Sequence, residues 1–147
     1  MKKFAFTLQA VEDITLATER QLKLEMQKIE ERLRQTLRRI EETKAERAGA
    51  ANRCALQMRT NGMDAETLVH YGHYLEKLDA ILDVLYEEKA RIELEKEKCL
   101  QRQIENRKEL KTLEKLRKKQ FEEYQAEQRR EEEKTIGDLV SYRSTIQ

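Results

Sequence analysis

The residues able to bind a metal ion or act as nucleophiles are few and scattered along the chain. His70 and His73 stand three positions apart, which would place both imidazoles on one face of a helix. A metal site needs further ligands, and neither Cys54 nor Cys99 lies at metal-ligand spacing from another Cys or His. We therefore predict no metal site and no bound cofactor.

Catalytic motifs are also missing from the sequence. It contains no glycine-rich phosphate-binding loop and no nucleophile elbow. Charged residues make up 40% of the chain and aromatic residues 5%, a composition typical of long solvent-exposed helices. Such helices offer no concave pocket that excludes water from a pair of catalytic groups. We predict no catalytic residues and a protein that is not an enzyme.

Basic side chains cluster in residues 107–119, where seven basic residues accompany two acidic ones. An acidic stretch from Glu122 to Glu133 follows directly, and no aromatic residues are interleaved for stacking on bases. Nucleic acid binding is therefore disfavoured, as the formal net charge of +1 also indicates. The cluster, which includes Lys115, Lys118 and Lys119, fits either a solvated helix face or a basic collar that meets an acidic protein partner.

The segment from Leu68 to Tyr86 holds more apolar residues than the seam between two helices can bury. A stripe at helical spacing runs along one side of that seam and consists of Tyr74, Leu78, Ile81 and Leu85. An isolated pair of helices would expose part of this stripe to water. It indicates a surface for a protein partner or a wider core near a turn, and the sequence leaves both open.

One break divides the chain into two helices. Between residues 8 and 135 it is the run from Thr60 to Asp64, where Gly62 can take a positive φ and Asp64 can cap the next helix. We predict an all-α fold, a single antiparallel coiled-coil hairpin over residues 1–135, with helices at about 6–60 and about 64–133. Residues 136–147 are polar and include Gly137, so we expect them to be frayed or disordered.

The register of the two helices can be tested on the sequence. If the chain reverses near Gly62, residue i faces a residue near 125 minus i. This register places Ile40 opposite Leu85, Leu33 opposite Ile92, Met26 opposite Cys99 and Met58 opposite Leu68. Apolar residues meet in every pair, which predicts a left-handed antiparallel coiled coil. Cys54 and Cys99 lie far apart in this register, so no disulfide is expected between them.

The beginning of the chain shows no targeting segment. Glu12 and Asp13 arrive before an apolar run long enough for a signal peptide develops, and no stretch approaches a membrane span. We therefore expect a cytoplasmic protein. The hairpin register also places Phe4 opposite Phe121, Leu8 opposite the region of Arg117, and Val11 opposite Leu113.

Several motifs resemble the flagellar export proteins of the FliJ type. They are the opening Lys3-Phe4-Ala5-Phe6-Thr7-Leu8-Gln9, the Asn61-Gly62 turn, the run Tyr71-x-x-Tyr74-Leu75-x-x-Leu78 and the final stretch with Arg143. The resemblance covers nearly the whole chain. Members of this family are cytoplasmic stalks of the flagellar type III export apparatus, similar in shape to the central stalk of rotary ATPases.

The resemblance implies three kinds of protein partner. The hairpin end that bears both termini would insert into the export ATPase ring through Phe4, Leu8, Lys115, Lys118, Lys119 and Phe121. The cytoplasmic domain of the export gate protein would contact Tyr74, Leu78, Ile81 and Leu85. Export chaperones would bind as well. The resemblance implies a monomer, held at the inner face of the cell membrane at the flagellar base through its partners.

One departure and two alternatives accompany this resemblance. Where the family can present further aromatics on the first helix, this sequence has Arg47, Ala48 and Ala51, so the resemblance does not extend to gate contacts from that helix. The alternatives are the corresponding stalk of an injectisome and a self-assembling coiled-coil scaffold. A scaffold predicts concentration-dependent assembly in size-exclusion chromatography, whereas a stalk predicts a monomer.

Overall fold

The structure, a computed structural model, describes residues 2–146 and contains two helices, α1 (Gln9–Thr60) and α2 (Ala65–Ile146). No strand occurs in this range. The helices contribute to two compact units. The turn unit comprises residues 22–102, and the terminal unit comprises residues 2–21 together with residues 103–146. The predicted all-α class is confirmed, as is the helical hairpin.

The turn between α1 and α2 follows from its residues. Gly62 has a φ of 69°, in the left-handed region that glycine enters without steric cost. Asp64 is the N-cap of α2, and its Oδ1 accepts a hydrogen bond from the Thr67 backbone N–H at 3.0 Å. Hydrogen bonding to Thr67 also lowers the pKa of the Asp64 carboxyl. The predicted turn at Asn61-Gly62 is confirmed.

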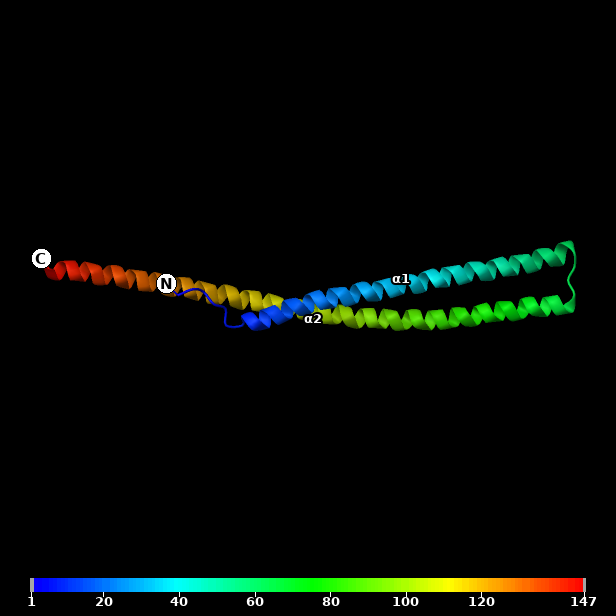
Figure 1. Cartoon of the computed structure of the whole chain (residues 1–147), viewed down its shortest axis with the longest axis horizontal. Helices are drawn as coiled ribbons and strands as arrows, with labels where there is room; N and C mark the ends of the chain where they lie inside the picture. Colours follow the sequence, from blue (N-terminus) through cyan, green and yellow to red (C-terminus); the bar gives the residue numbers. More distant parts are fainter. Residues whose placement is uncertain (1, 147) are drawn as a thin grey trace. The chain divides into compact units, whose positions relative to one another are not determined.

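Apolar side chains of the turn unit pack in the register that the sequence predicts. Figure 1 shows α1 and α2 of this unit running antiparallel from the turn. One buried cluster contains Leu22, Ile29, Ile92 and Cys99, with Met26 and Leu33 packed against it. Buried residues of α2 recur every seven positions, at Leu78, Leu85, Ile92 and Cys99. This heptad repeat is the pattern of a coiled-coil seam. Both cysteines are free thiols, as expected.

Burial of the seam decreases towards the turn. Met58 and Leu68, which the register places opposite each other, are 51% and 44% exposed. Tyr71 and Leu75 are half-buried. The facing part of α1 carries small residues such as Ala50, which is fully buried but covers little surface. The core therefore does not absorb all of the apolar residues near the turn.

Cysteines introduced at Leu33 and Ile92 should crosslink within one molecule, because Leu33 packs against the buried cluster that contains Ile92. The test uses a background in which Cys54 and Cys99 are replaced by alanine. Non-reducing gels and intact mass would show an oxidised monomer. Crosslinks formed only between chains would instead indicate a domain-swapped or parallel dimer.

The terminal unit begins with a non-helical segment, residues 2–8, that packs on α2. Phe6 is buried in it. The Thr7 backbone N–H donates to Gln120 Oε1 at 3.3 Å, and Gln120 Nε2 donates to Thr7 Oγ1 at 2.8 Å. The Tyr124 hydroxyl donates to the carbonyl oxygen of Lys2. These contacts hold the segment outside the helix, so α1 begins at Gln9 and not near residue 6.

A polar layer interrupts the seam of the terminal unit. Asn106 is buried, seven positions before the buried Leu113. Its Nδ2 donates a hydrogen bond to the carbonyl oxygen of the buried Thr15 at 3.1 Å. A buried amide in a coiled-coil seam lowers stability but selects one register, because other registers leave it without a partner.

The last part of α2 differs from its predicted boundary. The helix continues to Ile146 and not to about residue 133. Gly137 lowers helix stability by only about 1 kcal/mol relative to alanine, and no proline stops the helix. Every residue from 131 to 146 is exposed. Because no packing holds this stretch, its fraying in solution stays a prediction.

Candidate protein-docking surfaces

The apolar stripe of the turn unit is divided between the seam and the surface. Leu78 and Leu85 are only 6% and 2% exposed, so they pack between the helices. Tyr74 and Ile81 are 39% and 37% exposed and lie at the edge of that seam. Two of the four predicted residues are therefore accessible to a partner, and the other two support them from beneath. We call Tyr74 and Ile81 the edge patch.

Residues of α1 fix the position of Tyr74. The Tyr74 hydroxyl donates a hydrogen bond to Glu46 Oε1 at 2.8 Å. Arg53 Nη2 lies 3.4 Å from the same oxygen. Hydrogen bonding to Glu46 raises the pKa of the Tyr74 hydroxyl, and the hydrogen bond from Tyr74 lowers the pKa of the Glu46 carboxyl. The two shifts agree, since this geometry stabilises a neutral phenol beside a charged carboxylate.

Two more contacts from α1 reach α2 near the edge patch. Arg47 pairs with Asp79 through Nε and Nη2, and this pairing lowers the pKa of the Asp79 carboxyl. Lys44 Nζ lies 5.7 Å from the centroid of the Tyr86 ring, in cation–π range. The first helix of this chain thus supplies charged contacts to α2 near the edge patch.

A small hollow of about 200 Å³ adjoins the edge patch, lined by Thr67, His70, Tyr71 and Tyr74. All four residues belong to α2. Tyr74 is therefore both part of the edge patch and part of the lining of this hollow. The hollow is far too small and open to exclude water from a substrate.

Aromatic residues gather in the terminal unit around Phe4. Its ring lies edge-on to the Phe121 ring, with centroids 5.1 Å apart, and 5.6 Å from the Tyr124 ring. Such contacts add to the area that the rings bury. The predicted approach of Phe4 to Phe121 is therefore observed. Phe121 remains 41% exposed, so part of this aromatic cluster faces solvent, and Leu8 in the same unit is 36% exposed.

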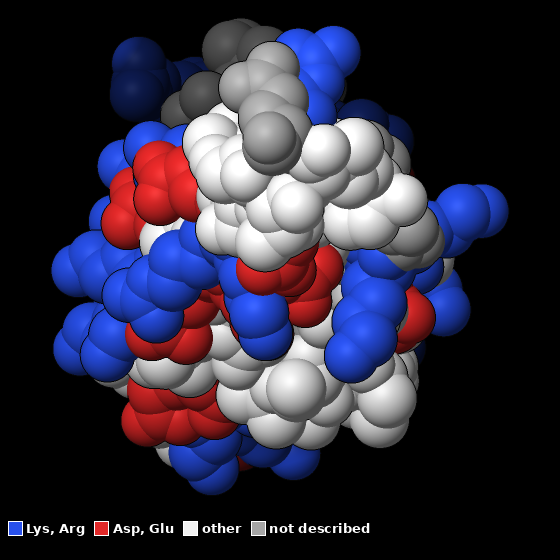
Figure 2. All heavy atoms as spheres, turned by 90° about the vertical axis from the view of Figure 1, so that its left-hand side faces the viewer, with Lys and Arg blue, Asp and Glu red and all other residues white. Residues whose placement is uncertain are grey.

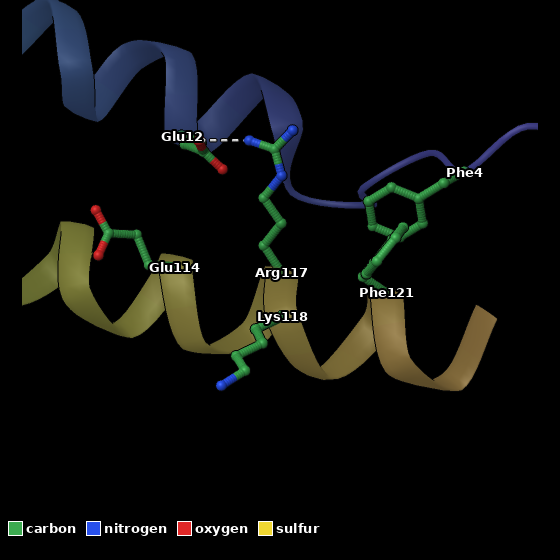
Figure 3. Close-up of a pocket in the computed structure, with 6 residues that line it drawn as sticks. All are labelled: Phe4, Glu12, Glu114, Arg117, Lys118 and Phe121. Atoms are coloured by element: carbon green, nitrogen blue, oxygen red, sulfur yellow. Dashed lines mark hydrogen bonds and ion pairs between the residues drawn. The ribbon is translucent and has the colours of Figure 1, made fainter. Parts of the chain in front are cut away.

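A buried carboxylate lies next to this cluster. Arg117 Nη1 donates to Glu12 Oε1 at 3.1 Å, and Figure 3 shows the Arg117 side chain reaching from α2 to Glu12 on α1. Glu12 Oε2 is buried and has no hydrogen-bond partner within the described residues. The two residues line a hollow of about 540 Å³ together with Phe4, Glu114, Lys118 and Phe121. The charges of this hollow balance, so its field favours neither anions nor cations.

The three lysines predicted to contact the ATPase are all exposed on α2 of the terminal unit. Lys115, Lys118 and Lys119 form no ion pair within residues 2–146. Figure 2, which faces the C-terminal end of α2, shows basic side chains projecting around a mainly uncharged front, with acidic side chains between them. The lysines are free to pair with a partner.

The described residues form neither a metal-binding cluster nor a membrane-spanning helix. His70 and His73 are exposed, and no group of three metal-binding side chains gathers within residues 2–146. Neither helix, over the part of the chain that the structure describes, holds an apolar stretch long enough to cross a bilayer.

Comparison with models of known protein families tests the resemblance described above. A family model described as "Flagellar FliJ protein" matches residues 4–145. The chain belongs to the FliJ family. Searches of curated proteins and of solved structures found no match. This FliJ-family chain is therefore a flagellar protein associated with export, with protein partners in the export apparatus.

Sequence reasoning missed several residues of these FliJ surfaces. It gave no role to Glu46 or Gln120, whose hydrogen bonds join segments far apart in the chain. It also gave no role to Glu12, an acidic residue in the first turn of α1. The available signal for Glu12 was its heptad spacing, since it lies three positions before the buried Thr15.

Proposed function

We propose that this protein is a non-enzymatic stalk that binds the flagellar export ATPase ring and couples it to the export gate and to export chaperones. It acts as a monomer in the cytoplasm and meets the membrane only through these partners. Family membership supports the flagellar export setting. The partners themselves are assigned from the surfaces that each unit exposes.

The observation that carries the proposal is the exposure of the edge patch. Tyr74 and Ile81 remain more than one-third exposed while their neighbours Leu78 and Leu85 are buried. Tyrosine is enriched among the residues that contribute most of the binding energy of an interface, and Ile81 extends the apolar surface beside it. We assign this patch to the cytoplasmic domain of the export gate protein.

The terminal unit supplies the second surface. Leu8 and Phe121 are partly exposed, the half-buried Phe4 packs on Phe121, and Lys115, Lys118 and Lys119 add positive charge on the same unit. An apolar contact with a basic rim fits a partner whose surface is apolar at the centre and acidic around it. We assign this surface to the export ATPase.

Replacing both Tyr74 and Ile81 with alanine should weaken binding to the isolated gate domain by about 30-fold or more, the loss expected of a hot-spot pair. Titration calorimetry with the purified gate domain measures this loss. Circular dichroism should stay nearly unchanged, because neither side chain belongs to the buried seam.

The matched control replaces Leu24 and Leu94 with alanine. These two leucines of the turn unit are 60% and 57% exposed and lie outside the edge patch. The control should bind the gate domain as the parent does. If the Tyr74 and Ile81 variant loses helicity together with binding, the two residues have a structural role. If its binding is unchanged, the edge patch does not bind the gate domain.

A further inference from the structure

The edge patch includes the exposed side chain of Tyr74, which would change its orientation freely in solvent if no other residue held it. Tyr74 is 39% exposed, so packing alone holds only part of its ring. An exposed tyrosine samples several side-chain rotamers, and a partner that needs one of them must select it on binding. What restricts the Tyr74 ring is its hydroxyl, which is hydrogen-bonded at 2.8 Å to Glu46 on the facing helix.

Glu46 is itself held in place. Arg53 lies about two helical turns further along α1, and its Nη2 is 3.4 Å from the carboxylate oxygen that accepts the Tyr74 hydrogen bond. A hydrogen bond to a charged acceptor is stronger than one between neutral groups. The contacts of Arg53 with Glu46 and of Glu46 with Tyr74 therefore link α1 to the exposed Tyr74 ring of α2.

We propose that Glu46 of α1 is a positioning residue for gate binding: its carboxylate holds the Tyr74 ring in the orientation that the gate domain recognises. The inference rests on the proposed function of the edge patch. Through Glu46, α1 contributes to binding of the gate domain without an aromatic residue of its own. Orientation matters because Tyr74 is exposed in the edge patch, beside the hollow that it lines with Thr67, His70 and Tyr71.

The experiment is a double-mutant cycle on the full chain with the purified gate domain. Glu46→Ala and Tyr74→Phe should each weaken binding about three- to tenfold, the factor that ordering one side chain carries. The double variant should bind no more weakly than either single one, because both changes remove the same hydrogen bond. Glu46→Gln should restore most of the affinity, since its amide oxygen still accepts from the hydroxyl.

A spectroscopic readout separates positioning from a general loss of stability. In Glu46→Ala, the Tyr74 phenol should titrate closer to its ordinary pKa, measured by NMR on ring-labelled tyrosine. The matched control is Glu95→Ala, which breaks another exposed ion pair between α1 and α2, with Arg32 at 2.7 Å. That control should leave both the Tyr74 titration and gate binding unchanged.

The possible failures are distinct. If Tyr74→Ala with Ile81→Ala has no effect on gate binding, the proposed function of the patch is overturned. If that double alanine variant weakens binding but Glu46→Ala binds like the parent, only the positioning role of Glu46 is overturned. Additive losses in the cycle would likewise overturn it, since Glu46 would then act by some route other than Tyr74.

Discussion

Replacing Ile92 with alanine should lower the free energy of unfolding of the turn unit by about 2–4 kcal/mol. Ile92 is 1% exposed and lies in the cluster of Leu22, Ile29 and Cys99. The shortened side chain leaves a cavity that two straight helices have little freedom to close, so the loss exceeds the transfer free energy alone. Urea denaturation followed by circular dichroism measures the change.

The matched variant is Leu94→Ala, two residues further along α2. Leu94 is 57% exposed, so its truncation should change the free energy of unfolding by less than about 0.5 kcal/mol. Equal losses in the two variants would show that a second chain covers Leu94 in solution. That outcome would favour the self-assembling scaffold over the monomeric stalk.

Reversing Lys115, Lys118 and Lys119 to glutamate should reduce stimulation of the export ATPase at least about tenfold at low salt. All three side chains are exposed and none forms an ion pair within the described residues, so helicity should not change. Attraction between exposed charges is screened over about 8 Å at physiological ionic strength. Stimulation by the parent chain should therefore fall as salt rises, and the reversed variant should lose that dependence.

The control for this experiment reverses Lys23, Lys28 and Lys77, three exposed lysines of the turn unit. It changes the net charge of the chain by the same amount and should leave stimulation intact. If the first variant still stimulates fully at low salt, the basic run has no electrostatic role in ATPase binding. Phe4, Leu8 and Phe121 would then be the contacts to replace.

The turn and the seam were predictable because their determinants lie close together in the sequence. Gly62 with Asp64 encodes a reversal through local backbone chemistry, and the observed φ and N-cap follow from those residue types. The heptad spacing encodes which residues face the seam, and Leu33 and Ile92 meet in one cluster as the mirrored register requires.

The two ends of the helices were less predictable. Helical periodicity cannot show that residues 2–8 leave the helix, because their partners Gln120 and Tyr124 lie more than one hundred positions away in the chain. The polar composition after about residue 133 predicts an earlier end of α2 than Ile146, where the structure ends it. A polar segment is expected to lack packing contacts. It can still be helical, because a helix needs only sufficient local propensity and the absence of proline.

The sequence by itself determined the class of fold, the place of the reversal, the facing register and the absence of the known catalytic motifs. Only the tertiary structure decided which apolar residues of the stripe are accessible, separating Tyr74 and Ile81 from Leu78 and Leu85. One position along a helix turns a side chain by about 100°, so small rotations of α2 move a residue between seam and surface. The tertiary structure alone also joined Glu46 to Tyr74, because a hydrogen bond depends on the distance between two helices and not on spacing within either.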